Sequence, residues 1–304
     1  MTNVFIDGSA GTTGLRLRER IEGRDDIELT ILPDALRKDP AAKRDALNAA
    51  DIVFLCLPDD AARESVAMIE NPMTRVIDTS TAHRTADGWT YGFPELIGTS
   101  AIANAKRIAN PGCHASGFIS LVAPLVRAGL LKSSVQLTAF SLTGYTGGGN
   151  KMIAEYEGDR PALYDAPRQY ALGQMHKHIP EMKKICGLST VPCFCPIVAD
   201  FPCGMEVTVP LFATDVAGSV EDIKDVYRRV YTGPLVACND ADEGGFLSAG
   251  AYAGRDSMGL SVYGNEERIL LVSRFDNLGK GASGAAIQNM NILLGTSETK
   301  GLVL

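Results

Sequence analysis

Cys113 lies in the run NPGCHASG, directly after Pro-Gly and directly before a histidine. The apolar stretch 116–131 follows and predicts a buried helix, which puts the thiol near a helix N-terminus. The partial positive charge there favours the thiolate, the nucleophilic form of cysteine. The pattern predicts a catalytic nucleophile. The alternative is a small buried residue, as we expect for Cys56 in IVFLCLP.

Two of the four histidines, His176 and His178, are separated by one residue in GQMHKHIPEM. Side chains two apart in an extended segment share one side, so both rings could serve one site. A neutral imidazole takes a proton from a thiol or gives one to an oxyanion. Either histidine is a candidate acid/base. The alternative is a surface loop before a helix whose first turn holds Pro180 and Glu181.

Three glycines in GSAGTTG lie between a predicted strand and a predicted helix. Glycines there allow a tight turn and close approach of the backbone to phosphate, and the helix N-terminus offers free amide donors. The spacing G-x-x-G-x-x-G differs from the commoner G-x-G-x-x-G, and a plain glycine-rich turn is the alternative. The candidate cofactor contacts in this loop are Gly8, Ser9, Ala10, Gly11, Thr12, Thr13 and Gly14.

The segment after the second predicted strand, TILPDALRKD, bears on which dinucleotide binds. NAD is usually held by an acidic residue at the end of this strand, but Asp34 comes slightly late, after a proline. Arg37 and Lys38 follow, and basic side chains suit the 2′-phosphate of NADP. The segment favours NADP, with a solvated loop as the alternative for each basic residue.

Three further loops carry polar residues that could meet a ligand. DTSTAHRT follows the fourth predicted strand, where parallel sheets place ligands. SLTGYTGGGNK is a glycine-rich loop that ends in a lysine, and FDNLGKG precedes a small-residue helix that could close over a cofactor. Simple turns are the alternative. The candidates in these loops are Ser80, His83, Arg84, Lys151, Asn277, Lys280 and Gly281.

The remaining cysteines do not predict a metal site. Cys193 and Cys195 are one residue apart in the apolar VPCFCPIV, with Cys186 and Cys203 nearby. Zinc sites usually use a spacing of two to four residues between paired cysteines, so structural thiols are favoured here. We therefore expect no metal.

Strands and helices alternate before residue 112, which predicts a parallel, doubly wound sheet of the Rossmann type. The predicted strands are 3–8, 27–33, 51–58 and 74–80, and the helices are 11–23, 38–50 and 59–70. After residue 112, longer strands predict an α+β domain with a mixed or antiparallel sheet. Its predicted strands are 134–143, 204–214, 259–265 and 268–276, and the later helices are 116–131, 220–231 and 281–295. We expect a nucleotide domain of residues 1–112 with 281–304 and a substrate and oligomerisation domain of residues 113–280.

Composition narrows the class of protein. A chain of 304 residues suits two domains, and a net charge of -7 argues against nucleic-acid binding. The N-terminus has no signal-peptide pattern, and no apolar run is long enough to span a bilayer. The seven cysteines are odd in number and irregularly spaced, which indicates thiols. We expect a cytoplasmic protein that binds small molecules, with no nucleic-acid or membrane partner.

Taken together, the motifs resemble the short form of the N-acetyl-gamma-glutamyl-phosphate reductase family over nearly the whole chain. GSAGTTG is similar to the family's NADP loop, NPGCHASG to its nucleophile motif, HKHIPEM to its His-x-His-x-Pro-Glu motif and NLGKGASGAAIQNMN to its cofactor-closing segment. DTSTAHR and YGFPEL also match. The longer form usually has an aromatic residue and then a threonine after the cysteine, whereas this chain has His114 and Ser116 in that region. The resemblance implies a homodimer or homotetramer, and the candidate substrate contacts are Arg84, Glu95, Lys151 and Glu181.

The family reaction that this resemblance implies is the NADPH-dependent reduction of an acyl phosphate to a semialdehyde. Cys113 would attack the acyl phosphate, and the resulting thioester would be reduced by hydride. Either His176 or His178 would be the acid/base. Two alternatives stay open: a semialdehyde dehydrogenase of the same layout that acts on aspartyl phosphate or a longer homologue, and a nucleotide-binding protein without catalysis.

Overall fold

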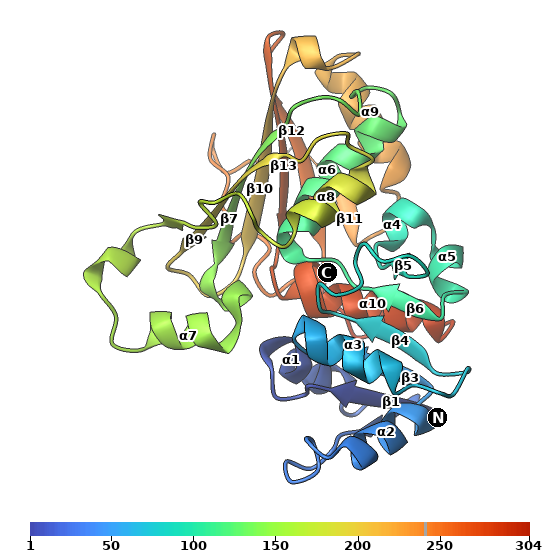
Figure 1. Cartoon of the computed structure of the whole chain (residues 1–304). Coiled ribbons are helices and arrows are strands. Elements are labelled where there is room, and N and C mark those ends of the chain that lie inside the picture. Colours follow the sequence, from blue (N-terminus) through green and yellow to red (C-terminus); the bar gives the residue numbers. More distant parts are fainter. Residues whose placement is uncertain (240–241) are drawn as a thin grey trace. The chain divides into compact units, whose positions relative to one another are not determined.

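The computed structural model describes residues 1–239 and 242–304, and the chain forms two compact units (Figure 1). The first unit consists of Met1–Pro111 with Ala282–Leu302, and the second of Gly112–Gly281 with Val303–Leu304. Each unit contains one sheet.

Among the described residues, the first unit is built on six parallel strands in the order β2-β1-β3-β4-β6-β5. The strands are β1 (Thr2–Asp7), β2 (Ile27–Thr30), β3 (Ile52–Leu55), β4 (Arg75–Asp78), β5 (Thr90–Tyr91) and β6 (Arg107–Ala109). The strand order reverses between β1 and β3, and sheets of this kind bind ligands beyond the strand ends at such a switch point. The predicted Rossmann-type sheet is confirmed.

Helices cover both faces of this sheet, as the alternation of strands and helices predicts. Ile6 packs in one apolar cluster with Leu17 and Ile287, whereas its neighbour Phe5 packs in a second cluster with Leu47. The helices are α1 (Thr12–Ile21), α2 (Pro40–Ala49), α3 (Asp59–Ala67), α4 (Pro94–Ile97), α5 (Thr99–Ala103) and α10 (Gly284–Leu293). The sequence analysis missed α4, α5, β5 and β6, because elements of two to five residues carry no readable periodicity.

The described part of the second unit contains a mixed sheet of seven strands in the order β11-β12-β13-β10-β7-β9-β8, which confirms the predicted class. The strands are β7 (Thr138–Gly144), β8 (Arg168–Gln169), β9 (Cys193–Ala199), β10 (Met205–Phe212), β11 (Val236–Cys238), β12 (Met258–Gly264) and β13 (Arg268–Phe275). The helices are α6 (Cys113–Arg127), α7 (Gly149–Glu157), α8 (Ile179–Cys186) and α9 (Val220–Val230). Short 3-10 turns are η1 (Tyr145–Gly148), η2 (Ala162–Asp165) and η3 (Ala213–Asp215), and a π turn, η4, spans Gly279–Ser283.

Helix α6 lies close against the sheet because Gly117 faces it: a Cβ at Gly117 would lie 2.4 Å from Val207. Pro124 inside the helix cannot donate to the carbonyl of Ser120, and the hydroxyl of Tyr231 on the chain after α9 donates to that carbonyl at 2.6 Å. These contacts fix the position of the helix that begins with Cys113. Its start lies three residues before the predicted one.

One prediction in the second unit is wrong, and one strand was missed. The segment 141–151 is not one glycine-rich loop, because it contains the end of β7, the η1 turn and the start of α7. The thiol-rich VPCFCPIV is largely strand β9, which the sequence analysis did not predict. Alternate buried and more exposed residues along β9 are the pattern that marks it as a strand.

Candidate active site

Cys113 is the first residue of α6, so the thiol lies at a helix N-terminus, and the helix begins three residues earlier than predicted. The N-cap is Gly112, in an extended conformation with φ −81° and ψ 144°. The side chain of Cys113 is half-buried, and the bare backbone of Gly281 passes beside it. A Cβ at Gly281 would lie 3.0 Å from the Cβ of Cys113, so a side chain there would crowd the thiol. Gly281 therefore borders the candidate nucleophile, and its role toward a cofactor stays a prediction.

Glu181 anchors the turn that carries the thiol. Its carboxylate is buried, and Oε1 accepts a hydrogen bond from the backbone N–H of Gly112 at 2.9 Å. Glu181 lies in the first turn of α8, where a carboxylate also suits the helix dipole. The contact ties the start of α8 to the start of α6. A substrate role for Glu181 stays a prediction, whereas its positioning of Gly112 is direct.

His176 and His178 lie together, but not for the predicted reason. The segment is not extended: His178 is the N-cap of α8 with helical angles, and its N–H donates to Nδ1 of His176 at 3.2 Å. The two ring centroids are 4.7 Å apart. A tight turn before Pro180 brings the rings together, where we expected strand alternation to do so. Both rings remain candidates for acid/base work.

His114 lies between these rings and the sheet. Its ring centroid is 5.4 Å from that of His176 and 5.7 Å from that of His178. Nδ1 is 2.6 Å from Ser141 Oγ, and Nε2 is 2.6 Å from the hydroxyl of Tyr170. Burial and the neighbouring His176 lower the pKa of His114 to about 3, so this ring is neutral over the physiological range. It does not act as a base that gains a full charge.

Sequence reasoning missed Tyr170 and Ser141 as members of this cluster. Burial and, to a smaller extent, the negative charge of Cys113 raise the pKa of Tyr170 well above that of an ordinary tyrosine. Ser141 lies on β7 and Tyr170 directly after β8, two strands that flank β9. Their convergence on His114 follows from strand order, which local patterns do not reveal.

The first unit has a cavity of about 370 Å³ that borders the glycine loop. Gly8, Ser9 and Ala10 line it, together with Arg37 and Lys38. The other predicted loop contacts, Gly11, Thr12, Thr13 and Gly14, form the N-cap and first turn of α1 and are not among the lining residues. Three of the seven predicted loop contacts therefore border the cavity, and the phosphate-binding role of the loop stays a prediction.

The glycine loop is tight. Gly8 has φ +89°, and a Cβ there would lie 2.3 Å from the carbonyl oxygen of Cys56. A Cβ at Gly14 would lie 2.3 Å from the carbonyl oxygen of Gly8, so the helix approaches the loop only with glycine at that position. Glycine at these two positions therefore lets the loop pack closely against β3 and α1, as the tight turn of a dinucleotide-binding loop requires.

Basic side chains border the same cavity in different states. Lys43 is an ion-pair partner of the buried Asp7, with Nζ 3.1 Å from Oδ2. Arg37 is half-exposed and its nearest carboxylate, Asp34, is 3.5 Å away and almost fully exposed. Lys43 is thus already neutralised, and Arg37 with Lys38 provides the positive charge beside the cavity.

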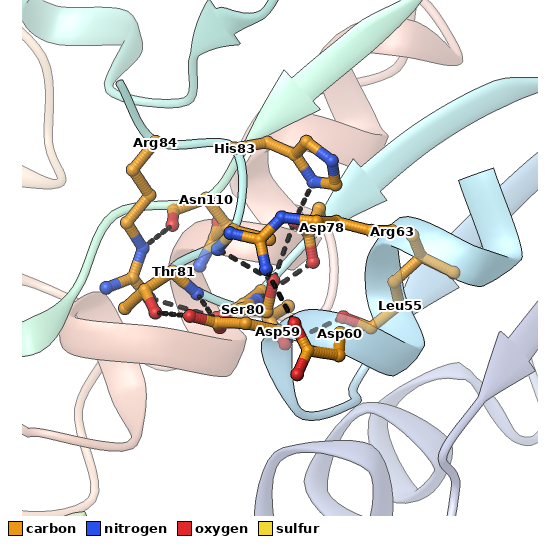
Figure 2. A network of polar contacts seen from close by, with 12 residues as sticks. Leu55, Asp59, Asp60, Arg63, Asp78, Ser80, Thr81, His83, Arg84 and Asn110 are labelled. Carbon is orange, nitrogen blue, oxygen red and sulfur yellow. Dashed lines mark hydrogen bonds and ion pairs between the residues drawn. The ribbon is translucent and has the colours of Figure 1, made fainter. Parts of the chain in front are cut away.

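The polar residues after β4 form a network of their own (Figure 2). The hydroxyl of Ser80 donates to the buried Asp78, and Nδ1 of His83 lies 2.6 Å from the same carboxylate. Arg84 donates to the carbonyl oxygens of Asn110 and Thr79, both at 2.9 Å. These contacts hold the strand end in shape. The predicted cofactor role of Ser80 and substrate role of Arg84 stay predictions.

The other candidates lie in varied surroundings. Lys151 is on α7, not at a loop end, and its side chain is 91% exposed. Glu95 accepts from Gln288 at 3.0 Å. Asn277 uses both ends of its amide, since Oδ1 accepts from Gly204 and Nδ2 donates to Thr146. Lys280 is buried within the η4 turn. Their ligand contacts stay predictions.

In the part of the chain that the structure describes, no group of three or more histidine, cysteine, aspartate or glutamate side chains is arranged to hold a metal ion. None of the described helices has the length and apolar character needed to cross a membrane. All seven cysteines lie within the described ranges, and none of them forms a disulfide bond.

Comparison with known proteins decides the family. Residues 113–277 match the dimerisation domain of semialdehyde dehydrogenases, and residues 33–105 match their NAD-binding domain. N-acetyl-gamma-glutamyl-phosphate reductase 2 of Pseudomonas putida is 44% identical over 98% of both chains. The reductase of Rhizobium meliloti is 46% identical over 96% of this chain and 98% of its own. This chain belongs to the N-acetyl-gamma-glutamyl-phosphate reductase family.

Solved structures place this reductase family member in a wider fold group. Aspartate semialdehyde dehydrogenase II of Vibrio cholerae superposes with a TM-score of 0.74 at 18% identity, over 98% of this chain and 99% of that one. The enzyme of Francisella tularensis gives 0.72 at 16% identity, over 97% and 100%. At such identities the likeness shows the fold alone. The reductase relatives, not these structures, set the family.

Proposed function

We propose that this chain reduces N-acetyl-gamma-glutamyl phosphate to N-acetylglutamate semialdehyde with NADPH and releases phosphate, in arginine biosynthesis. The observation that carries the proposal is Cys113 at the first position of α6, in a chain over 40% identical to reductases of that name. We assign NADP binding to residues 1–112 with 281–304 and substrate binding to residues 113–280.

The residues around the thiol divide the work. The thiolate of Cys113 attacks the acyl carbon, the bond to the phosphate oxygen breaks, and phosphate leaves while a thioester forms. NADPH supplies the hydride that reduces this thioester. The thiohemiacetal then releases the aldehyde and returns Cys113. Glu181 holds the turn before Cys113 throughout, through the N–H of Gly112.

One of His176 and His178 moves the protons, giving one to the oxyanion of the thiohemiacetal or taking one from the thiol. His114 does not share this role, because burial and His176 hold its pKa near 3. The two candidate rings lie 4.7 Å apart. The geometry supports a role for the pair and leaves open which ring is the acid/base.

The residues beside the 370 Å³ cavity fit a phosphorylated nucleotide. Gly8 leaves the backbone bare where a Cβ would collide with Cys56, which suits a pyrophosphate at the start of a helix. Arg37 and Lys38 would hold a 2′-phosphate, which favours NADP over NAD. In this proposal Arg37 and Lys38 bind the 2′-phosphate, which NADP has and NAD lacks.

The proposal is tested by the reverse reaction of the purified protein. With N-acetylglutamate semialdehyde, phosphate and NADP, NADPH should form, and omission of phosphate should abolish its formation. Aspartate semialdehyde and longer homologues serve as competing substrates. Faster turnover of one of these would establish the related semialdehyde dehydrogenase activity instead. NADP binding without turnover of any of them would favour a nucleotide-binding protein.

We further propose that the protein is a homo-oligomer, a dimer or tetramer, that uses the open face of the seven-stranded sheet. Phe140, Phe212 and Leu270 are exposed on this face, on three neighbouring strands. Apolar patches of this kind are common at subunit contacts. Sedimentation velocity of the wild type and of Phe140→Asp tests the proposal, because a charge there should shift the mass toward the monomer.

We also propose a cytoplasmic location. Free thiols at all seven cysteine positions accord with a reducing compartment. Fractionation of cells that carry the tagged protein tests this location.

A further inference from the structure

His114, the residue directly after Cys113, links two side chains from the sheet region by hydrogen bonds. Ser141 Oγ lies 2.6 Å from Nδ1, and Tyr170 Oη lies 2.6 Å from Nε2. All three side chains are largely buried, and Ser141 has no accessible surface. A neutral imidazole donates through one nitrogen and accepts through the other, so one of two tautomers must be present.

Ser141 selects the tautomer. In the described part of the chain, the hydrogen-bond partner of its hydroxyl is Nδ1 of His114 alone. If Nδ1 carried the proton, the hydroxyl of Ser141 would be a buried donor without an acceptor, which is unfavourable. The hydroxyl of Ser141 therefore donates to Nδ1, and the proton of His114 is on Nε2.

This choice sets the direction of the next hydrogen bond. Nε2–H donates to Oη of Tyr170, so the phenol accepts from His114 and turns its own proton away from it. Through this bond Tyr170 contacts the residue directly after Cys113. Burial and, to a smaller extent, the charge of Cys113 raise the pKa of the phenol, so it is a neutral hydrogen-bond donor across the physiological range.

We propose that Ser141 and His114 are positioning residues that fix the His114 tautomer, so that the hydroxyl of Tyr170 donates a hydrogen bond to the Cys113 thiolate and to the oxyanion formed on it. The role of the thiolate rests on the proposed function, whereas the tautomer and the hydrogen-bond direction do not. A donor aimed at developing negative charge lowers the barrier to acyl transfer.

The first experiment reads the tautomer directly. Two-bond ¹H–¹⁵N NMR spectra of the full-length protein resolve the ring nitrogens of its four histidines, and His114→Gln identifies the signals of residue 114. We expect a protonated Nε2 in the wild type and a mixed tautomer in Ser141→Ala. A protonated Nδ1 in the wild type would overturn the proposal.

The second experiment measures the pH profile of Cys113 alkylation by iodoacetamide, which needs no substrate. The ionisable side chains that contact the neighbouring Gly112 and His114, namely Glu181 on α8 and His176 and His178 before α8, stay unchanged. Tyr170→Phe should shift the profile to higher pH, and Ser141→Ala should shift it less. Profiles that coincide with the wild type for both variants would contradict the proposal.

The third experiment measures kcat and KM of the variants, which distinguishes a positioning role from a loss of folded protein. Tyr170→Phe should lower kcat by about 10-fold or more with little change in KM, since the bond acts on the transition state. His114→Gln keeps a donor near Nε2 and should retain more activity than His114→Phe. Ser120→Ala is the matched control, because it removes a buried hydroxyl that donates only to the carbonyl of Gly117 in its own helix. A Ser141→Ala variant that matches Ser120→Ala in kcat would exclude the positioning role.

Discussion

The starts of α1 and α6 share one backbone device. Each helix has a glycine N-cap, Gly11 with φ −78° and ψ 163° and Gly112 with φ −81° and ψ 144°. Neither N-cap makes a side-chain cap, and neither first turn has an acidic residue, within the residues that the structure describes. Both helix ends thus carry the partial positive charge of a helix N-terminus.

The surroundings make the two ends different. The start of α1 follows a loop that borders an open cavity with Arg37 and Lys38 at its side. The start of α6 carries a half-buried thiol near a cluster of imidazole rings, and Glu181 occupies the N–H of Gly112. In the proposed function, the same kind of helix terminus binds an anion in one unit and stabilises a thiolate in the other. The neighbours decide the chemistry, not the turn.

The largest effect should come from the thiol at the start of α6. Cys113→Ser replaces the thiolate by a poorly ionised hydroxyl, so phosphate-dependent turnover should fall on the order of 10³- to 10⁵-fold. NADPH affinity, measured by fluorescence titration, should stay within about two-fold, because Cys113 does not line the cavity. Turnover near that of the wild type would show that Cys113 at the start of α6 is not the catalytic nucleophile.

A change in the glycine loop before α1 should instead weaken NADPH binding. Gly8→Ala meets both a left-handed φ and a carbonyl oxygen 2.3 Å from the new Cβ. Gly23→Ala is the matched control, because Gly23 has φ +83° and no atom within 4 Å of its Cβ. Both variants should lose about 1 kcal/mol of stability from the left-handed φ.

Only Gly8→Ala must also move the loop, so its NADPH affinity should fall by about 10-fold or more. Isothermal titration and chemical denaturation measure the two quantities. Equal NADPH affinities for the two variants would show that the tight loop does not hold the nucleotide.

The sequence predicted best where one local pattern repeats. Alternating strands and helices indicated the parallel sheet, and the run after Cys113 indicated α6, although its start was placed three residues late. The start was late because Cys113, His114 and Ala115 carry no helical periodicity of their own. The glycines at 147–149 hid α7, because glycine-rich runs are typical of loops.

Only part of the candidate active site could be predicted from the sequence, for a different reason. Cys113 and the histidine pair are marked by neighbours in sequence, whereas Ser141 and Tyr170 reach His114 across three adjacent strands. Strand order is a tertiary property that composition and spacing do not encode locally. The turn at His178 was misread because a histidine N-cap has no strong signature, although Pro180 correctly indicated a helix start.

A smaller effect should come from the buried His114, which should make the stability of the protein depend on pH. His114 has a folded pKa of about 3, against 6.5 for an ordinary histidine. Between these values the unfolded chain binds more protons, so the contribution of His114 to stability is complete above pH 6.5 and is lost as the pH falls toward 3.

His114→Gln lacks this titration, so its unfolding free energy should fall less steeply between pH 6.5 and 4 than that of the wild type. Urea denaturation at several pH values measures both slopes. Parallel curves would show that His114 is not buried in the neutral form.

The smallest effect should come from the exposed charges beside the cavity. Arg37→Ala removes one cation near the proposed 2′-phosphate site, and exposed charges contribute modestly, so KM for NADPH should rise about two- to five-fold. KM for NADH should change less, because NADH lacks the phosphate. Arg63→Ala is a close control. Arg63 pairs with Asp60, three residues before it, as Arg37 pairs with Asp34, and the two arginines are similarly exposed. Arg63 does not line the cavity. Equal changes in the KM for NADPH and the KM for NADH would show that Arg37 does not distinguish the two dinucleotides. The same change in Arg63→Ala would show that the effect does not come from a charge beside the cavity.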